Sequence, residues 1–227
     1  MRTVAVIAVL AALGGLMLAL IPPEEEAMPT SQPPELGVED RTTLLRLARE
    51  ALAAHLIGDE SPSVDEATLS PDLLRDAACF VTLTKDGQLR GCILDRFEAH
   101  EAMYANVMRN VALAATQDPR FSPVTPAEVP LLSIEISVLG APYAVEFEDA
   151  DALLAALRPG EDGVILTTAY GTATYLPQVW EQIPDPAEFL SSLCQKHGAP
   201  SACWAHPPYP EVQVYHVLHF SEPNATR

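Results

Sequence analysis

FVTLTKDGQLRGCI, at residues 80–93, carries the clearest structural signal in the chain. Two runs of strand-forming residues flank Asp86-Gly87, and Asp-Gly suits a two-residue type I′ turn because both central positions need a positive φ. The stretch therefore predicts a β-hairpin. With a turn of that length, Cys92 on the second strand would lie opposite Val81 on the first.

The residues on both sides of this hairpin alternate between the periodicities of helices and strands. Helices are predicted over 38–57, 99–116 and 151–157 and from 186 onwards, and further strands over 132–138, 164–168, 172–176 and 212–220. Strands and helices are interspersed without the regular spacing of βαβ units. This order indicates an α+β fold with largely antiparallel sheets.

Composition excludes several classes of protein. The 227 residues include 13 basic and 31 acidic side chains, so the net charge is −18. Such a surface repels phosphate backbones and excludes a nucleic-acid binder driven by counterion release. With 48% hydrophobic and 19% charged residues the chain is not wholly disordered, and four cysteines are too few for a disulfide scaffold.

Residues 4–21 form an uncharged apolar run. As a helix it would be about 27 Å long, close to the ~30 Å hydrocarbon core of a bilayer and longer than the apolar part of most signal peptides. We therefore expect an uncleaved membrane anchor, with a cleaved secretory signal as the alternative. Arg2 precedes the run and three glutamates, at 24–26, follow it. This bias predicts a folded domain on the extracytoplasmic side.

Five prolines lie between residues 22 and 34, and no apolar period accompanies them. That composition is typical of an extended, partly stiff spacer. The chain is therefore divided into an anchor or signal at 1–21, a linker at 22–36 and a folded part at 37–227.

Cys92 is the first candidate for chemistry. Residues two apart on a strand share a face, so Arg90 is expected beside Cys92, where a guanidinium would favour the reactive thiolate. Gly91 between them predicts close approach by a ligand or by another backbone. The alternative is that Cys92 is a small buried hydrophobic residue.

The other cysteines and the histidines give weaker signals. Cys194 and Cys203 each precede a histidine by three positions, which makes a zinc site conceivable, but a disulfide between them or two buried thiols is simpler. Cys79 and Cys92 are diagonal across the hairpin, so a disulfide between them would need distortion. His216 and His219 would point to opposite faces of a strand. We therefore expect neither a metal nor a cofactor.

Asp118 and Arg120, in the DPRF stretch at 118–121, leave two interpretations open. The pair could bind an anion or a substrate. Alternatively, Asp118 accepts backbone N–H groups and fixes its own turn.

Four ordered blocks resemble the signature of the AMMECR-one domain family, and its bacterial members are similar to AmmeMemoRadiSam system protein A. The blocks are LRGCI at 89–93, DPRF at 118–121, IEISVL at 134–139 and TYLPQVW at 174–180. The resemblance covers roughly residues 38–220. It implies an α+β fold of two interlocked subdomains and, as partners, Memo-like and radical SAM proteins.

The resemblance also implies that the site lies at the Leu-Arg-Gly-Cys-Ile-Gly motif, here residues 89–94. Leu94 departs from this motif by replacing the final glycine, which narrows any space beside the strand. The candidate catalytic residues are Cys92 and Arg90. The candidate ligand-binding residues are Gly91, Asp118, Arg120 and Gln178.

Two hypotheses of function follow. The first is a membrane-tethered accessory module that binds a small ligand or a protein partner beside Arg90 and Cys92. The second is an enzyme that uses Cys92 as a nucleophile, with Arg90 lowering its pKa and His100 or Asp118 as the general base.

Overall fold

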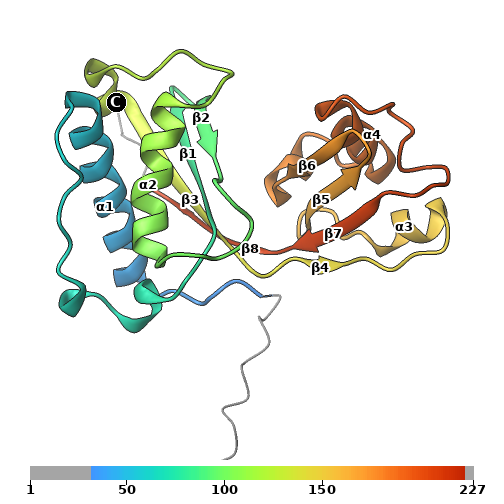
Figure 1. Cartoon of the computed structure of the whole chain (residues 1–227), viewed down its shortest axis with the longest axis horizontal. Helices are drawn as coiled ribbons and strands as arrows, with labels where there is room; N and C mark the ends of the chain where they lie inside the picture. Colours follow the sequence, from blue (N-terminus) through green and yellow to red (C-terminus); the bar gives the residue numbers. More distant parts are fainter. Residues whose placement is uncertain (1–31, 223–227) are drawn as a thin grey trace, which may run out of the picture.

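The structure, a computed structural model, describes residues 32–222. Two lobes lie side by side, each built on one four-stranded sheet (Figure 1). The predicted membrane segment at 4–21 and most of the predicted linker lie outside the described residues. Among residues 32–222, no helix is both long enough and apolar enough to cross a bilayer.

The first lobe consists of an antiparallel sheet with two helices on one of its faces (Figure 1). The strand order is β2-β1-β3-β8. The elements are α1 (Val38–Ile57), β1 (Cys79–Lys85), β2 (Gln88–Ile93), α2 (Met103–Thr116), β3 (Leu132–Leu139) and β8 (Val217–Ser221). The short 3-10 turns η1 (Glu66–Thr68), η2 (Pro71–Leu74) and η3 (Pro126–Leu131) complete the lobe.

The second lobe carries the other antiparallel sheet, in the order β4-β7-β5-β6. Its elements are β4 (Tyr143–Ala144), α3 (Ala150–Ala156), β5 (Gly163–Thr168), β6 (Gly171–Tyr175), η4 (Pro177–Glu181), α4 (Pro186–Lys196) and β7 (Glu211–Tyr215). The α+β class and the antiparallel sheets expected from the sequence are thereby confirmed.

Local sequence explains the clearest elements. In α1 the buried residues are spaced three and four apart, from Leu44 to Leu52, and the helix ends at Gly58, whose left-handed φ of 79° suits glycine. The hairpin turn has positive φ at both Asp86 and Gly87, as predicted. The helix predicted from residue 99 begins only at Met103, because Ala102 forms a β-bridge with Asp76.

The two lobes interlock because the chain crosses between them twice, from β3 to β4 and from β7 to β8 (Figure 1). The prediction of one closing strand over 212–220 was therefore wrong. The strand breaks at His216, whose carbonyl accepts a hydrogen bond from the Gly140 N–H at 2.9 Å and whose ring lies 3.1 Å from the Asp162 carboxylate. The residues before the break join the second sheet and those after it join the first.

One face of the first sheet is apolar and lies against α1 and α2. Val81, Leu83, Ile134 and Ile136 are fully buried there, at alternate positions of β1 and β3. The opposite face, which no helix of this lobe covers, points toward the second lobe. At one end of that face Phe80 packs in a small apolar cluster with the fully buried Tyr215, and this cluster joins the lobes.

Candidate functional site

The hairpin contains a β-bulge that the sequence did not predict. Lys85 pairs with Gln88 and Thr84 with Leu89, but Leu83 pairs with Gly91, so the register shifts by one residue. Arg90 is the extra residue. Cys92 consequently pairs with Thr82 instead of Val81, and the expected register is corrected.

Gly91 faces α2. A Cβ atom at this position would lie 2.1 Å from the carbonyl oxygen of Ala114, so only glycine allows the helix to approach the strand this closely. Of the two interpretations of Gly91, the approach of another backbone is the one that the structure shows. The predicted ligand-binding role has no support in this packing, because Gly91 lies on the helix side of the sheet.

The side chain of Arg90 is directed to Glu128 and away from Cys92. Its Nε donates to the Glu128 carboxylate at 3.1 Å and its Nη1 to the Ser122 carbonyl at 2.8 Å. Arg90 holds the pKa of Glu128 well below its usual range, assisted by the Thr125 N–H and by Lys85. The expectation that Arg90 activates Cys92 was therefore wrong, because the bulge diverts the guanidinium.

Asp118 connects the edge strand β2 to the turn that follows α2. Its buried carboxylate accepts the Cys92 N–H at 2.9 Å and the Arg120 N–H at 3.1 Å. Arg120 also donates to it from Nη2 at 2.7 Å, and this bond is the main cause that lowers the pKa of Asp118 to about 2. Asp118 thus fixes its own turn and also satisfies an N–H at a sheet edge.

Arg120 supplies the positive charge beside Cys92. Its Nη2 lies 3.4 Å from the Cys92 carbonyl oxygen, and its charge lowers the pKa of the thiol. About half of the side chain is exposed, at 51%. No hydrogen bond from Nη1 is found among the described residues, and the guanidinium also interacts with the Cys92 side chain and with the Phe121 ring.

The face of the first sheet that no helix covers carries a polar row. Thr82 pairs with Cys92 on one side and with Glu135 on the other, and paired residues point to the same face. Ser137 lies two residues along β3 from Glu135 and pairs with His219. The Thr82 hydroxyl donates to the Cys92 sulfur at 3.3 Å.

The second lobe places two polar side chains against this face. The Lys196 ammonium, at the end of α4, donates to the Thr174 carbonyl at 2.7 Å. Desolvation by the surrounding protein lowers the pKa of Lys196, and the charge of Arg120 lowers it further. Gln178 donates to the Ser137 hydroxyl at 3.4 Å. Lys196 thus comes from the second lobe, and its charge interacts with both Arg120 and Cys92.

Cys92 is a protonated thiol in this setting at neutral pH. Burial raises the pKa of the half-buried thiol, and the Thr82 hydrogen bond and the Arg120 charge offset this only in part. Neither expected general base is suited to the role. His100 lies on the loop before α2, where its ring is hydrogen bonded to the Glu98 carbonyl and to Arg109 of α2. Asp118 is too weak a base, because its pKa is lowered.

Comparison with known proteins places this geometry in a family. The sequence profile described as AMMECR1 matches residues 45–220, which is more than three quarters of the chain. The chain belongs to the AMMECR1 family.

Two archaeal proteins are among the relatives of this AMMECR1 domain. A protein of Methanothermobacter thermautotrophicus is 35% identical over 182 residues, which cover 79% of this chain and 92% of the relative. A protein of Methanopyrus kandleri is 33% identical and covers 83% and 91% respectively. The crystal structure of an uncharacterised protein from Pyrococcus horikoshii superimposes with a TM-score of 0.73 at 30% identity, over 79% of this chain and 90% of that one.

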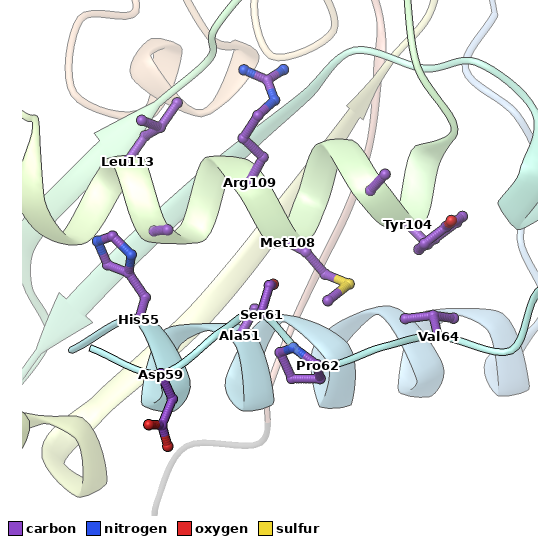
Figure 2. Close-up of a pocket in the computed structure, with 12 residues that line it drawn as sticks. Ala51, His55, Asp59, Ser61, Pro62, Val64, Tyr104, Met108, Arg109 and Leu113 are labelled. Carbon is purple, nitrogen blue, oxygen red and sulfur yellow. The ribbon is translucent and has the colours of Figure 1, made fainter. Parts of the chain in front are cut away.

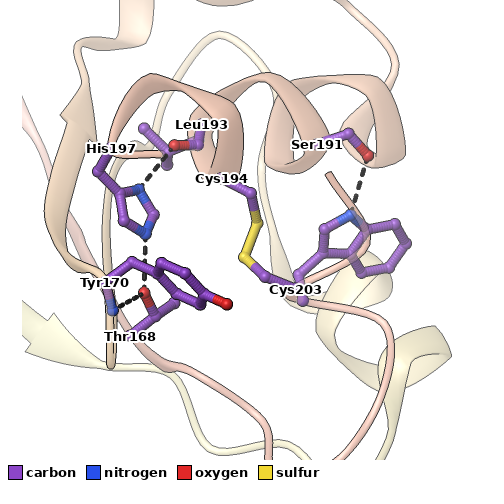
Figure 3. Close-up of a disulfide and its surroundings, with 8 residues drawn as sticks. Thr168, Tyr170, Ser191, Leu193, Cys194, His197 and Cys203 are labelled. Atoms are coloured by element: carbon purple, nitrogen blue, oxygen red, sulfur yellow. Dashed lines mark hydrogen bonds between the residues drawn. A yellow bond between two sulfur atoms is a disulfide. The ribbon is translucent and has the colours of Figure 1, made fainter. Parts of the chain in front are cut away.

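The second lobe of the AMMECR1 domain contains a disulfide between Cys194 and Cys203 (Figure 3). Figure 3 shows His197 turned from this bond toward Thr168, to which its Nε2 is hydrogen bonded at 2.8 Å. Of the alternatives left open by the sequence, the disulfide is the one present. Within residues 32–222 no cluster of three or more His, Cys, Asp or Glu side chains could hold a metal.

A separate hollow of about 450 Å³ lies between α1, α2 and the segment at 59–64 (Figure 2). Figure 2 shows His55 of α1 pointing toward α2, and Met108 and Val64 among the apolar lining residues. The hollow lies on the helix side of the first lobe. None of the site residues that were predicted from the sequence lines this hollow.

Sequence reasoning missed three residues of the site, which are Thr82, Glu135 and Lys196. The strand alternation in β1 and β3 already placed Thr82 and Glu135 on the polar face. Lys196 had no sequence signal, because its position depends on how the second lobe meets the first.

Proposed function

We propose that this AMMECR1 domain is a binding module for a small anion, which it holds between its lobes with Arg120 and Lys196. Two observations carry this proposal, in a chain whose net charge is −18. The Arg120 guanidinium lies 3.4 Å from the Cys92 carbonyl oxygen, and the charge of Lys196, from the other lobe, interacts with both Arg120 and Cys92. Like charges repel, so an anion between them is stabilising.

The hydrogen-bonding groups of both cations support the proposal. Asp118 holds the Nε and Nη2 side of the Arg120 guanidinium, and no described residue accepts a hydrogen bond from its Nη1. The Lys196 ammonium has three donors, and the Thr174 carbonyl uses one of them. A carboxylate or a phosphate oxygen is the acceptor that such donors prefer.

The same contacts disfavour the alternative of a Cys92 nucleophile assisted by Arg90. Arg90 is bound to Glu128, and burial raises the pKa of Cys92. Cys92 then lines the proposed site, and the Cys92 sulfur orients the Thr82 hydroxyl by accepting its hydrogen bond.

Isothermal titration calorimetry on the full chain in mild detergent tests the proposal, with phosphate and acetate as the probes. We expect Arg120→Gln and Lys196→Gln each to weaken binding by about tenfold or more, since each removes a charge-assisted contact. Arg46→Gln, which changes an exposed arginine on α1, should leave the affinity unchanged. Equal losses in all three variants, or no binding by the unaltered protein at ~10 mM ligand, would contradict the proposal.

We also propose that residues 4–21 tether the domain to a membrane with the folded part on the extracytoplasmic side. Three observations support this: the apolar run, the Arg2 and glutamate flanks, and the Cys194–Cys203 disulfide, since disulfides persist in oxidising compartments. The Memo-like and radical SAM partners implied by the resemblance remain an expectation, and anion binding does not require them.

A fusion of alkaline phosphatase after Arg227 tests this location. We expect an active fusion that sediments with membranes, whereas a cleaved signal would release an active, shorter fusion in soluble form. An inactive fusion beside an active cytoplasmic reporter would contradict the proposed orientation.

A further inference from the structure

Glu135 is a carboxylate that accepts no hydrogen bond from residues 32–222. It lies on the open face of β3, its side chain is only 28% exposed, and its one partner in an ion pair among the described residues is the His219 ring at 3.5 Å. No hydrogen bond to its carboxylate is found in the described part of the chain. Water reaches this carboxylate, and a ligand that carries a donor would replace that water with a charge-assisted hydrogen bond.

A second acceptor without a donor lies nearby. The Oε1 atom of Gln178 is buried and has no hydrogen-bond partner among the described residues, although its Nε2 donates to Ser137. Ser137 is two residues from Glu135 on the same face of β3, and Ser137 pairs with His219. Two acceptors that lack donors therefore lie at one end of the site. An ammonium group, with three donors and a positive charge, matches both.

The two ends of the polar row thus differ in charge. Arg120 lies beside Cys92 at one end, and the charge of Lys196 interacts with both. Glu135 lies at the other end, with Thr82 between Cys92 and Glu135 in the register. Neighbouring strands are about 4.8 Å apart, so the backbones of Cys92 and Glu135 are separated by roughly 10 Å. Opposite charges at the two ends of this span suit a short ligand that carries opposite charges at its own ends.

We infer that the ligand is a small amino carboxylate, whose carboxylate binds at Arg120 and Lys196 and whose ammonium group binds at Glu135 and Gln178. This inference rests on the proposed anion site and adds the chemical class of its ligand. Simple anions then bind more weakly than amino carboxylates, because they leave the Glu135 end unoccupied.

Calorimetry with glycine, β-alanine and γ-aminobutyrate, each compared with acetate, propionate or butyrate of the same chain length, tests the inference on the full chain. We expect one amino carboxylate to bind about tenfold or more tightly than its matched carboxylate. Glu135→Gln, which is nearly isosteric, should remove this preference and leave the affinity for the simple carboxylate equal or higher. Glu39→Gln, which alters an exposed carboxylate in the first turn of α1, is the matched control and should keep the preference.

The outcomes separate the inference from the proposal beneath it. If carboxylates bind and Arg120→Gln abolishes that binding, but no amino carboxylate binds more tightly, the inference is overturned and the anion site stands. If neither class binds, both are overturned. If ethylamine binds as tightly as the best amino carboxylate, Arg120 and Lys196 do not bind the ligand carboxylate, and the inference is again overturned.

Discussion

The backbone N–H of Cys92 donates a hydrogen bond of 2.9 Å to the carboxylate of Asp118, 26 residues further along the chain. The same carboxylate accepts a hydrogen bond from the guanidinium of Arg120. One buried group therefore fixes both β2, which carries Cys92, and the cation beside it. Two sequence blocks that are far apart in the chain are thereby parts of one site.

Asp118→Asn should lower the free energy of unfolding by about 2 kcal/mol at pH 7, because a buried, charge-assisted contact is lost. The folded pKa of Asp118, about 2, lies below the ~3.9 of an unfolded aspartate, so its stabilisation is present above pH ~4 and is lost as the pH falls through 2. Urea unfolding of both proteins across this range measures the effect. Asp149→Asn, at an exposed helix cap, is the control and should change little.

Cys92 should react slowly with iodoacetamide at pH 7, and its rate should rise at a higher pH than the ~8.5 of an ordinary thiol, because burial raises its pKa. Arg120→Gln should slow the reaction further, by about fivefold if the lost interaction is ~1 kcal/mol. Arg90→Gln should leave the rate unchanged. If Cys92 reacts more slowly in Arg90→Gln than in Arg120→Gln, Arg90 and not Arg120 is the residue that lowers the pKa of the thiol.

Gly91→Ala should destabilise the first lobe by about 1–3 kcal/mol or more, because the added methyl group meets the Ala114 carbonyl. Leu89→Ala on the same strand removes a side chain that is 41% exposed and should cost less than ~1 kcal/mol. Thermal or urea unfolding distinguishes the two variants. Equal stabilities would show that α2 does not approach the strand as closely as described.

Thiol counting checks the disulfide. The denatured, unreduced protein should show two free thiols, from Cys79 and Cys92, and four after reduction. Replacing Cys194 and Cys203 together by alanine should lower the free energy of unfolding by about 2–3 kcal/mol, the loop-closure value for a loop of roughly ten residues. Four thiols before reduction would contradict the bond.

Much of the fold could be predicted from local patterns. Apolar residues three and four positions apart, from Leu44 to Leu52, predicted the helix α1, and Asp86-Gly87 predicted the hairpin. Each of these patterns depends only on neighbouring residues. The bulge at Arg90 could not be predicted. It accompanies the approach of Ala114 to Gly91, a contact between distant segments that local patterns do not record.

The site was predictable only in part, for the same reason. Cys92, Asp118 and Arg120 stood out as members of short motifs. Arg120 rather than Arg90 is the cation beside the thiol because of the bulged register of β1 and β2. Lys196 belongs to the second lobe, and its charge interacts with Arg120 and Cys92. The break at His216 follows from a bond to Gly140, which no strand periodicity records.

The central claim is that Arg120 and Lys196 hold one anion between the lobes. Crystals of the full chain grown with selenate test it directly, since the anomalous signal of selenium locates the anion. We predict one selenate site with oxygen atoms about 3 Å from both the Arg120 guanidinium and the Lys196 ammonium. Selenate bound elsewhere, or at one of these side chains without the other, would contradict the account.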